Sequence, residues 1–366
     1  MGMAIILIGL IVAFFIFIYI FIHLPAFGKK PTGERLEKVS ASIHFRNGKF
    51  QNIHHTPIMA EGGNPLKILR EFMQSRNRMP EDTLPSVKTN LHNLKPDADV
   101  LVWFGHSSYY LQIDDYKILV DPVLSGHASP VSFITRAFKG ADIYNASDIP
   151  YIDYLFITHD HWDHLDYRTL LQLKFKIKTI ICALGVGEHL EYWGFDKNRI
   201  IERDWDEVIR FPGDLTVYTI PARHFSGRGP ARNHSQWTSY LLKVRDYKIY
   251  IGGDSGYDNH FAEAQKRFGA MDLAILENGQ YNHNWRYIHM LPNEVLQAAR
   301  DLQARRVLPV HSCKFALGIH PWYEPLTKIS ELNKIENLSL LTPKIGEPVF
   351  LKDDSQNFSN WWEGIR

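Results

Sequence analysis

One short segment concentrates the residue types that bind metal ions, and it reads His159-Asp160-His161-Trp162-Asp163-His164. The apolar run at 154–158 precedes it and predicts a buried strand that ends at the first histidine. Alternate side chains of extended backbone share a side, so the first two histidines can face one metal while Asp163 and His164 face a second. Imidazole and carboxylate ligands without sulfur favour Zn²⁺, with Fe or Mn as alternatives.

Three isolated residues stand at the ends of later predicted strands. His224 follows the run at 217–223, Asp254 follows 249–253 with its two glycines, and His311 follows 307–310. Any one of them alone is more often an ordinary loop residue. Ligands drawn singly from strand ends are, however, the form that a site assembled from several loops takes. Together with the first segment they favour a metal site.

These motifs resemble those of the metallo-β-lactamase superfamily, in which His-x-His-x-Asp-His is followed by a single His, Asp and His. Further segments resemble the branch that includes N-acyl-phosphatidylethanolamine-hydrolysing phospholipase D and ascorbate-6-phosphate lactonase. They are Trp-Phe-Gly-His-Ser-Ser at 103–108, Leu-Val-Asp-Pro-Val-Leu-Ser at 119–125, Pro-Ala-Arg-His-Phe-Ser at 221–226, Gly-Asp-Ser-Gly-Tyr at 253–257 and Val-His-Ser at 310–312. The resemblance covers most of the chain from about Phe45 and specifies fold and metal site more closely than substrate.

The resemblance implies an α+β domain, an αββα sandwich, with two zinc ions. Carried over by position, it places His159, His161 and His224 on the first zinc and Asp163, His164 and His311 on the second, with Asp254 bridging both. Two such ions present a bridging hydroxide at neutral pH and suit the cleavage of a phosphodiester. We therefore expect Asp163 and Asp254 to be catalytic as well as metal-binding.

Three other residues are candidates for supporting roles. His289 resembles a substrate-contacting histidine of the phospholipase branch, and it precedes a predicted helix start whose N–H groups could receive a phosphate. A capping or packing role for His289 is the alternative. Asp121 follows a predicted strand, and we expect it to orient the metal loop rather than to catalyse. His106 is open to the same two interpretations.

Residues 4–22 are all apolar or aromatic except Gly9, which is about the length of ~20 residues that crosses a bilayer as a helix. A cleaved signal peptide is the alternative, but it would have a charged start and a shorter apolar core. No basic residue precedes the span, and Lys29, Lys30, Arg35 and Lys38 follow it. The positive-inside tendency thus predicts a single-pass membrane protein with its catalytic domain on the cytoplasmic side. The resemblance to the phospholipase does not lead us to expect this span.

The chain has 366 residues and a formal net charge of +1, so no electrostatic field favours nucleic acid. Its two cysteines, Cys182 and Cys313, lie in separate apolar stretches, which excludes a disulfide scaffold and a thiolate zinc site. We expect a membrane anchor over 1–27, a linker over 28–44 and the hydrolase domain over 45–366.

Short apolar runs separated by turn residues predict strands, with helices between some of them. Strands are predicted at 100–104, 109–113, 116–121, 154–158, 179–182, 215–220, 237–244, 248–251, 273–276 and 307–310. Helices are predicted at 66–78, 167–173, 186–193, 259–268 and 293–303. This order agrees with a sheet sandwich covered by helices.

The leading functional interpretation is a membrane-anchored zinc phosphodiesterase of phospholipase D type, acting on a lipid or lipid-like substrate. A lactonase or another ester hydrolase is the alternative within the same fold, because the same hydroxide attacks a carbonyl carbon. Two other classes stay open. An iron-dependent oxidoreductase of this fold would have an acidic residue in place of His161, and a metal-free binding protein would not need all seven ligand positions filled.

Overall fold

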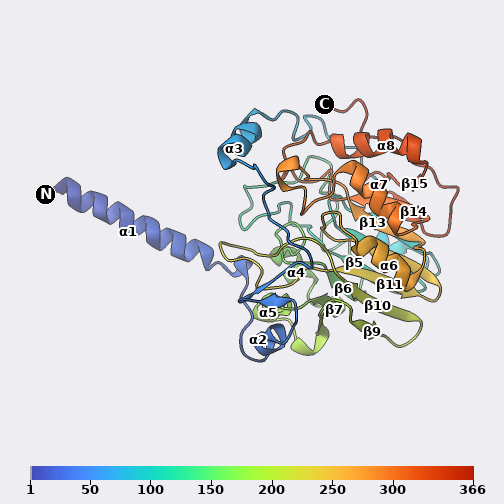
Figure 1. Ribbon diagram of the computed structural model, residues 1–366, viewed down its shortest axis with the longest axis horizontal. Coiled ribbons are helices and arrows are strands. Elements are labelled where there is room, and N and C mark those ends of the chain that lie inside the picture. Colours follow the sequence, from blue (N-terminus) through green and yellow to red (C-terminus); the bar gives the residue numbers. More distant parts are fainter. Residues whose placement is uncertain (1) are drawn as a thin grey trace.

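The computed structural model describes residues 2–366, and its body consists of two seven-stranded sheets packed face to face (Figure 1). The first sheet has the order β16 (Pro348–Phe350), β3 (Val100–Trp103), β4 (Tyr109–Ile113), β5 (Tyr116–Val120), β6 (Ile152–Ile157), β7 (Ile177–Ala183) and β8 (Ile200–Arg203). The second has the order β15 (Ser339–Leu340), β14 (Arg306–Val310), β13 (Leu273–Glu277), β12 (Tyr247–Ile251), β11 (Ser239–Val244), β10 (Leu215–Ile220) and β9 (Val208–Arg210). Each sheet is antiparallel in one half and parallel in the other.

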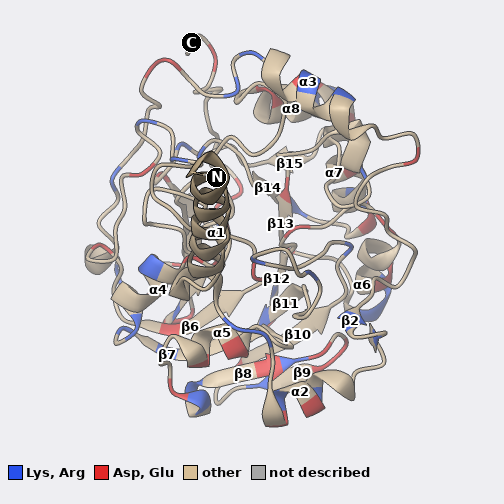
Figure 2. Ribbon diagram, turned by 90° about the vertical axis from the view of Figure 1, so that its left-hand side faces the viewer, with Lys and Arg blue, Asp and Glu red and all other residues tan. Residues whose placement is uncertain are grey.

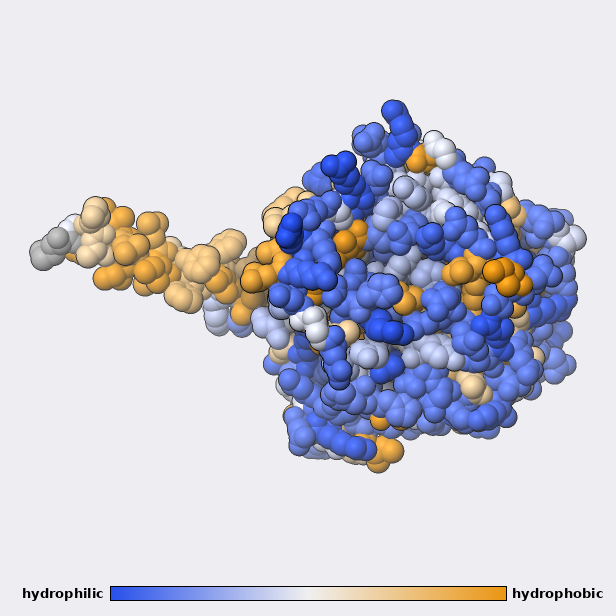
Figure 3. Space-filling view, turned by 45° about the horizontal axis from the view of Figure 1, so that its top comes forward, coloured by the Kyte–Doolittle hydropathy of each residue, from blue (hydrophilic) through white to orange (hydrophobic). Residues whose placement is uncertain are grey.

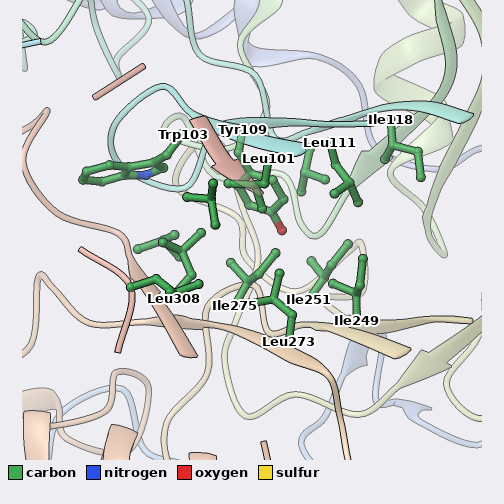
Figure 4. Close-up of a cluster of buried hydrophobic side chains, with 14 of the residues drawn as sticks. Leu101, Trp103, Tyr109, Leu111, Ile118, Ile249, Ile251, Leu273, Ile275 and Leu308 are labelled. Atoms are coloured by element: carbon green, nitrogen blue, oxygen red, sulfur yellow. The ribbon is translucent and has the colours of Figure 1, made fainter. Parts of the chain in front are cut away.

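The main core fills the space between the two sheets. Leu101, Leu111 and Ile118 of the first sheet lie opposite Ile251 and Ile275 of the second (Figure 4). All five side chains are buried, because alternate residues of each strand point into this layer. The two sheets are therefore held together mainly by aliphatic packing.

Helices cover the outer face of each sheet. The first sheet carries α4 (Tyr167–Leu173) and α5 (Gly187–Tyr192), and the second carries α6 (His260–Phe268), α7 (Pro292–Asp301) and α8 (Glu324–Glu336). Leu170 of α4 and Leu190 of α5 belong to one outer core, and Phe261 of α6, Val295 of α7 and Ile329 of α8 belong to the other. This confirms the predicted αββα sandwich. Short 3₁₀ turns lie at η1 (Pro25–Phe27), η2 (Leu91–Asn93), η3 (Lys197–Arg199) and η4 (His283–Trp285).

Helix α1 (Gly2–Ile22) projects away from the body, and none of its residues is buried (Figure 1). It carries no charged side chain, and its apolar surface contrasts with the mostly hydrophilic body (Figures 2 and 3). Within residues 2–366, α1 is the one helix long and apolar enough to cross a membrane.

The region predicted as a linker, residues 28–44, contains helix α2 (Gly33–Ser40) and packs on the body. Arg35 forms ion pairs with Glu188 and Glu202, and Val39 is buried. The structure thus differs from the predicted linker. The helix has only two apolar residues, Leu36 and Val39, and its ion-pair partners lie more than a hundred residues away in the chain, so the local pattern was too short to indicate it.

The segment between α2 and β3 has few strands of its own. It contains the hairpin of β1 (Phe45–Arg46) and β2 (Lys49–Phe50), followed by α3 (Pro65–Gln74). The side chain of Asn64 caps α3 by accepting a hydrogen bond from the backbone N–H of Leu66. Several apolar residues of α3 stay exposed, among them Leu66 and Met73, which are 77% and 71% exposed.

Candidate metal centre

The strands β6, β10, β12 and β14 each lead at their carboxyl end into one of the predicted metal-binding positions. The structure brings all seven predicted ligands together in two neighbouring groups. One group consists of His159, His161, His224 and Asp254, and the other of His106, Asp163, His164 and His311. Within each group, one potential ligand atom per residue lies within 4.8 Å of all the others.

The first group converges through its ring nitrogens. Nδ1 of His161 lies 2.9 Å from Nε2 of His159 and 3.2 Å from Nε2 of His224. Oδ2 of Asp254 lies 3.7 Å from Nε2 of His224. Four ligands that surround a zinc ion at 2.0–2.1 Å lie about 3.3 Å from one another. The spacing of this group therefore fits a tetrahedral metal ion.

Asp254 also reaches the second group. Its Oδ1 lies 3.2 Å from Nε2 of His164 and 3.2 Å from Nδ1 of His311, while Oδ2 of Asp163 lies 3.6 Å from Nε2 of His164. Nε2 of His164 and Oδ1 of Asp254 are buried, yet neither has a hydrogen-bond partner among residues 2–366. Buried polar atoms without a partner are costly, and a cation shared between them would remove that cost. The donor set therefore fits two metal ions with Asp254 between them.

Neighbouring side chains fix the orientation of these ligands. Oδ2 of Asp121 accepts hydrogen bonds from Nδ1 of His164 at 2.8 Å and from Oγ1 of Thr158 at 2.6 Å. Oδ1 of Asp121 accepts from the backbone N–H of Thr158 at 2.9 Å. His224 donates through Nδ1 to the carbonyl of Ile288 at 2.9 Å. Such contacts direct the opposite ring nitrogen toward a metal, which is the orienting role expected for Asp121.

The electrostatics of the site favour a bound cation. Burial, together with the neighbouring imidazoles, lowers the pKa of His159 and of His224 well below the ordinary value, so both rings are neutral and offer lone pairs. Burial also opposes a proton on His164, but the carboxylates of Asp254 and Asp163 raise its pKa well above the ordinary value. The carboxylates of Asp254 and Asp163 thus stabilise a positive charge beside His164. A metal ion bound to the same carboxylates and to His164 would supply that charge.

Comparison with known proteins identifies the family to which the chain belongs. The profile of the beta-lactamase superfamily domain matches residues 116–312, a range that contains every predicted ligand. This chain belongs to the beta-lactamase superfamily. An uncharacterized protein of Mycobacterium tuberculosis is 32% identical over 314 residues, which make up 84% of this chain and 84% of that protein.

Two further proteins are similar to this chain, one in sequence and one in fold. The N-acyl-phosphatidylethanolamine-hydrolyzing phospholipase D 1 of Caenorhabditis elegans is 26% identical over 296 residues, 76% of this chain and 83% of that protein. The crystal structure of a possible metal-dependent hydrolase from Veillonella parvula has the same fold, with a TM-score of 0.55 and 18% identity over 69% of this chain and 99% of that one. The chain is a metal-dependent hydrolase of the superfamily, with relatives named as phospholipases D.

His106, whose role the sequence left open, lies inside the second group. Its Nε2 donates to Oδ2 of Asp163 at 2.8 Å, and its side chain is fully buried. The residue occupies the turn between β3 and β4 with a positive φ of 53°. His106 therefore orients the Asp163 carboxylate in this structure, a contact that spans 57 residues of sequence and that no local pattern could have revealed.

His289 lies beside the two groups, and its partner Glu277 was not predicted. Nδ1 of His289 donates to Oε2 of Glu277 at 2.6 Å, and Oε1 accepts from the backbone N–H of Met290 at 2.8 Å. Burial raises the pKa of Glu277 well above and lowers the pKa of His289 below their ordinary values. Glu277 ends β13, so its position at a strand end was a signal that went unused.

The expectation that the helix after His289 could receive a phosphate on its N–H groups stays a prediction, and the structure places an acidic side chain at that helix start. Helix α7 begins at Pro292, as its sequence suggests, but the carboxylate of Glu294 occupies the start of the helix. Its Oε2 accepts from the backbone N–H of Leu291 at 2.9 Å. A carboxylate at that place repels a phosphate, and it satisfies the N-terminal donor instead.

A cavity of about 350 Å³ opens onto the metal centre. Its polar wall contains candidate ligands together with His289 and Gln280, and its remaining wall is mainly apolar. The apolar residues are Ile58, Met59, Ile68, Phe225, Trp285, Ile288 and Leu317. The hydrolase therefore presents its reactive groups at the base of a hydrophobic pocket, which suits a ligand with both a polar and an apolar part.

Proposed function

We propose that this protein is a membrane-anchored dinuclear zinc hydrolase, a phosphodiesterase of phospholipase D type that acts on a lipid or lipid-like phosphodiester. The observation that carries the proposal is the hydrophobic pocket whose polar wall is formed by His161, Asp163, Asp254 and His311. A soluble phosphodiester would not require such an apolar wall. The similarity to phospholipases D that hydrolyse N-acyl-phosphatidylethanolamine supports the same substrate class.

In this proposal His159, His161 and His224 hold one zinc ion. Asp163, His164 and His311 hold the other, and Asp254 contacts both. When bound, two such ions lower the pKa of a water and stabilise negative charge on the phosphoryl oxygens. The imidazole-rich first group favours zinc over manganese, because manganese prefers more oxygen ligands.

The side chains around the ligands position the substrate and the proton-bearing groups. His106 and Asp121 hold Asp163 and His164 in place. His289 faces the same pocket with its Nδ1 bound to Glu277, which leaves the lone pair of Nε2 to accept a hydrogen bond from a water or from an N–H or O–H group of the substrate. Ile58, Met59 and the other apolar wall residues receive an acyl chain, so binding energy from the lipid aligns its phosphate with the metal centre.

Two features support contact with a bilayer. In this proposal helix α1 serves as a single-pass anchor, and the basic residues after it favour a catalytic domain on the cytoplasmic side. Helix α3 borders the pocket through Ile68, while Leu66 and Met73 are exposed and Arg70 supplies a positive charge. An exposed apolar face with basic residues is typical of helices that lie in a membrane surface. The pocket then opens close to its lipid substrate.

A side-by-side substrate panel tests the proposed function. The zinc-loaded full chain in detergent would be given N-acyl-phosphatidylethanolamine, a simple lactone and a β-lactam, and each product would be quantified. We expect release of the phospholipid head group to exceed lactone and β-lactam turnover, and Asp254→Asn to abolish it. Asp153→Asn is the matched control, because Asp153 also lies in the domain but contacts only the backbone N–H of Lys117 at 3.0 Å. Preferred turnover of the lactone would overturn the phosphodiesterase assignment.

A further inference from the structure

A second cavity, of about 380 Å³, lies where α1 meets the body of the protein. We call it the juxtamembrane cavity, and it is lined by residues 22–23, 27–31, 160, 189, 227–231 and 234–235. It shares no lining residue with the pocket at the metal centre. Ile22 and Phe27 contribute apolar surface, and most of the ionisable groups in its wall are basic.

Of the three Lys and Arg side chains in the cavity wall, Lys29 pairs with Glu188 at 3.3 Å, whereas Lys30 and Arg228 make no ion pair within residues 2–366. Arg228 is only 4% exposed, and its guanidinium donates to the backbone carbonyls of Ala26, Asp160 and Leu165 rather than to any carboxylate within residues 2–366. A buried arginine is rarely left without an anion. Lys30 also lines the cavity, and it has no ion-pair partner among those residues either.

Asp160 is the one carboxylate in the cavity wall, and its oxygens are already engaged. Oδ1 accepts from the backbone N–H of Gly227 at 2.6 Å, and Oδ2 accepts from Oγ of Ser235 at 2.6 Å and from Nε2 of His189 at 3.1 Å. The Asp160 carboxylate therefore belongs to this local network and does not pair with Lys30 or Arg228. The lining contains Lys29, Lys30 and Arg228 against the single carboxylate of Asp160, so the excess of positive charge favours an anion.

The position of the cavity indicates where such an anion comes from. Ile22 is the last residue of α1, so in a bilayer crossed by α1 the cavity lies at the depth of the lipid head groups. Basic pockets at that depth bind the phosphate of anionic lipids, while neighbouring apolar side chains contact the acyl chains.

We propose that the juxtamembrane cavity is a binding site for an anionic phospholipid of the surrounding bilayer, with Lys30, His234 and Arg228 facing the head-group phosphate. The proposal rests on the proposed membrane span of α1, and it does not depend on the hydrolytic activity. The bound lipid is a structural ligand and is distinct from the substrate.

This lipid site is directly connected to the metal loop. The guanidinium of Arg228 lies 4.0 Å from the ring centre of Trp162, and the ring of Phe27 packs edge-on against Trp162 at 5.1 Å. Trp162 stands between His161 and Asp163 in the sequence. A lipid phosphate beside Arg228 therefore neutralises a charge that packs on the loop carrying the predicted ligands.

The test uses the full chain in nanodiscs of phosphatidylcholine with a minor fraction of phosphatidylglycerol. Native mass spectrometry after release from the discs would count retained phosphatidylglycerol molecules. We expect selective retention by the wild-type chain and by Asp254→Asn, in which the metal centre is disabled but the cavity is intact. Lys30→Ala and His234→Ala should each weaken retention, for Lys30 by about fivefold, which is the effect of one lysine near an anionic surface. Lys334→Ala is the matched control, because Lys334 is basic and exposed on α8 but lies outside the cavity.

Equal retention by the wild type, Lys30→Ala and Lys334→Ala would overturn the proposal, since the lipid would then bind without the basic residues of the cavity. Loss of retention in Asp254→Asn would also overturn it, because the lipid would then occupy the metal centre. Binding of inorganic phosphate to the full chain would be measured in a separate experiment. Binding of phosphate without retention of phosphatidylglycerol would show that the cavity takes a soluble anion, contrary to the proposal.

Discussion

Replacing Asp121 by Asn perturbs the metal centre without touching a predicted ligand. Asp121 follows β5, and its carboxylate accepts three hydrogen bonds, one from His164 and two from Thr158. The amide of Asn keeps the shape of the side chain but turns one of the two acceptors into a donor. The residue has a positive φ of 41°, a region that Asn tolerates, so the backbone should not change.

The size of the effect follows from these contacts. If the amide nitrogen replaces Oδ2, both Nδ1 of His164 and Oγ1 of Thr158 lose their acceptor, and the His164 ring is then no longer held with Nε2 toward the metal. The amide oxygen is expected to stay in the place of Oδ1, where it still accepts from the backbone N–H of Thr158. Loss of such an orienting contact lowers metal affinity by roughly 10- to 100-fold, which corresponds to about 1.4–2.8 kcal/mol. The ion held by His164 should be weakened more than the ion held by His159, His161 and His224.

Competition with a chromogenic zinc chelator would measure both affinities in the detergent-solubilised full chain. Asp153→Asn serves as the control, because Asp153 accepts a backbone hydrogen bond in the same sheet but lies outside both groups of ligands. We expect one ion of Asp121→Asn to be lost at a chelator concentration that leaves the control with two. If both ions bind Asp121→Asn as tightly as they bind the wild type, the orienting role is refuted.

Three other perturbations have defined outcomes. A Cβ at Gly279 would lie 2.0 Å from the carbonyl oxygen of His311, so Gly279→Ala should displace that ligand and reduce the metal content, measured by elemental analysis, from two ions toward one. Glu277→Gln should leave the metal content unchanged but lower phospholipid turnover by about tenfold, because His289 loses the carboxylate that orients it. Burial lowers the pKa of His260 to about 4, below its ordinary value, so the unfolded chain binds more protons and stability is lost as the pH falls from about 6.5 toward 4. At pH 5 this cost is about 2 kcal/mol for His260, and urea titrations of metal-free wild type and His260→Asn should differ by that amount between pH 7 and pH 5.

The central strands could be predicted because each is a short, buried apolar run bounded by turn residues. The predictions at 109–113 and 215–220 coincide with β4 and β10, and the metal-binding residues were found because they lie at the ends of such strands. The helix predicted at 167–173 coincides with α4. Local hydrophobic periodicity was therefore sufficient to predict the layers of the sandwich.

Elements that are stabilised mainly by contacts with distant parts of the chain were not predicted. β8 and β9 are short, partly exposed strands at the edges of the two sheets, and both contain charged residues. β16 lies near the end of the chain and pairs with β3, which is far from it in the sequence. Helix α8 has charged residues on much of its surface and contributes Ile329 to the outer core. Their stability comes from tertiary contacts rather than from a local pattern. The same reason explains why Glu277 was missed as the partner of His289.

The most direct test of the proposed function is to determine which product receives the oxygen of the attacking water. Metal-replete full chain would hydrolyse N-acyl-phosphatidylethanolamine in water labelled with heavy oxygen, and mass spectrometry would locate the label in the products. Cleavage of the phosphodiester places the label on the phosphate of the phosphatidate, and the label should disappear with turnover when a chelator removes the metal. Label in a released fatty acid would show attack on a carbonyl carbon and would contradict the proposed phosphodiesterase.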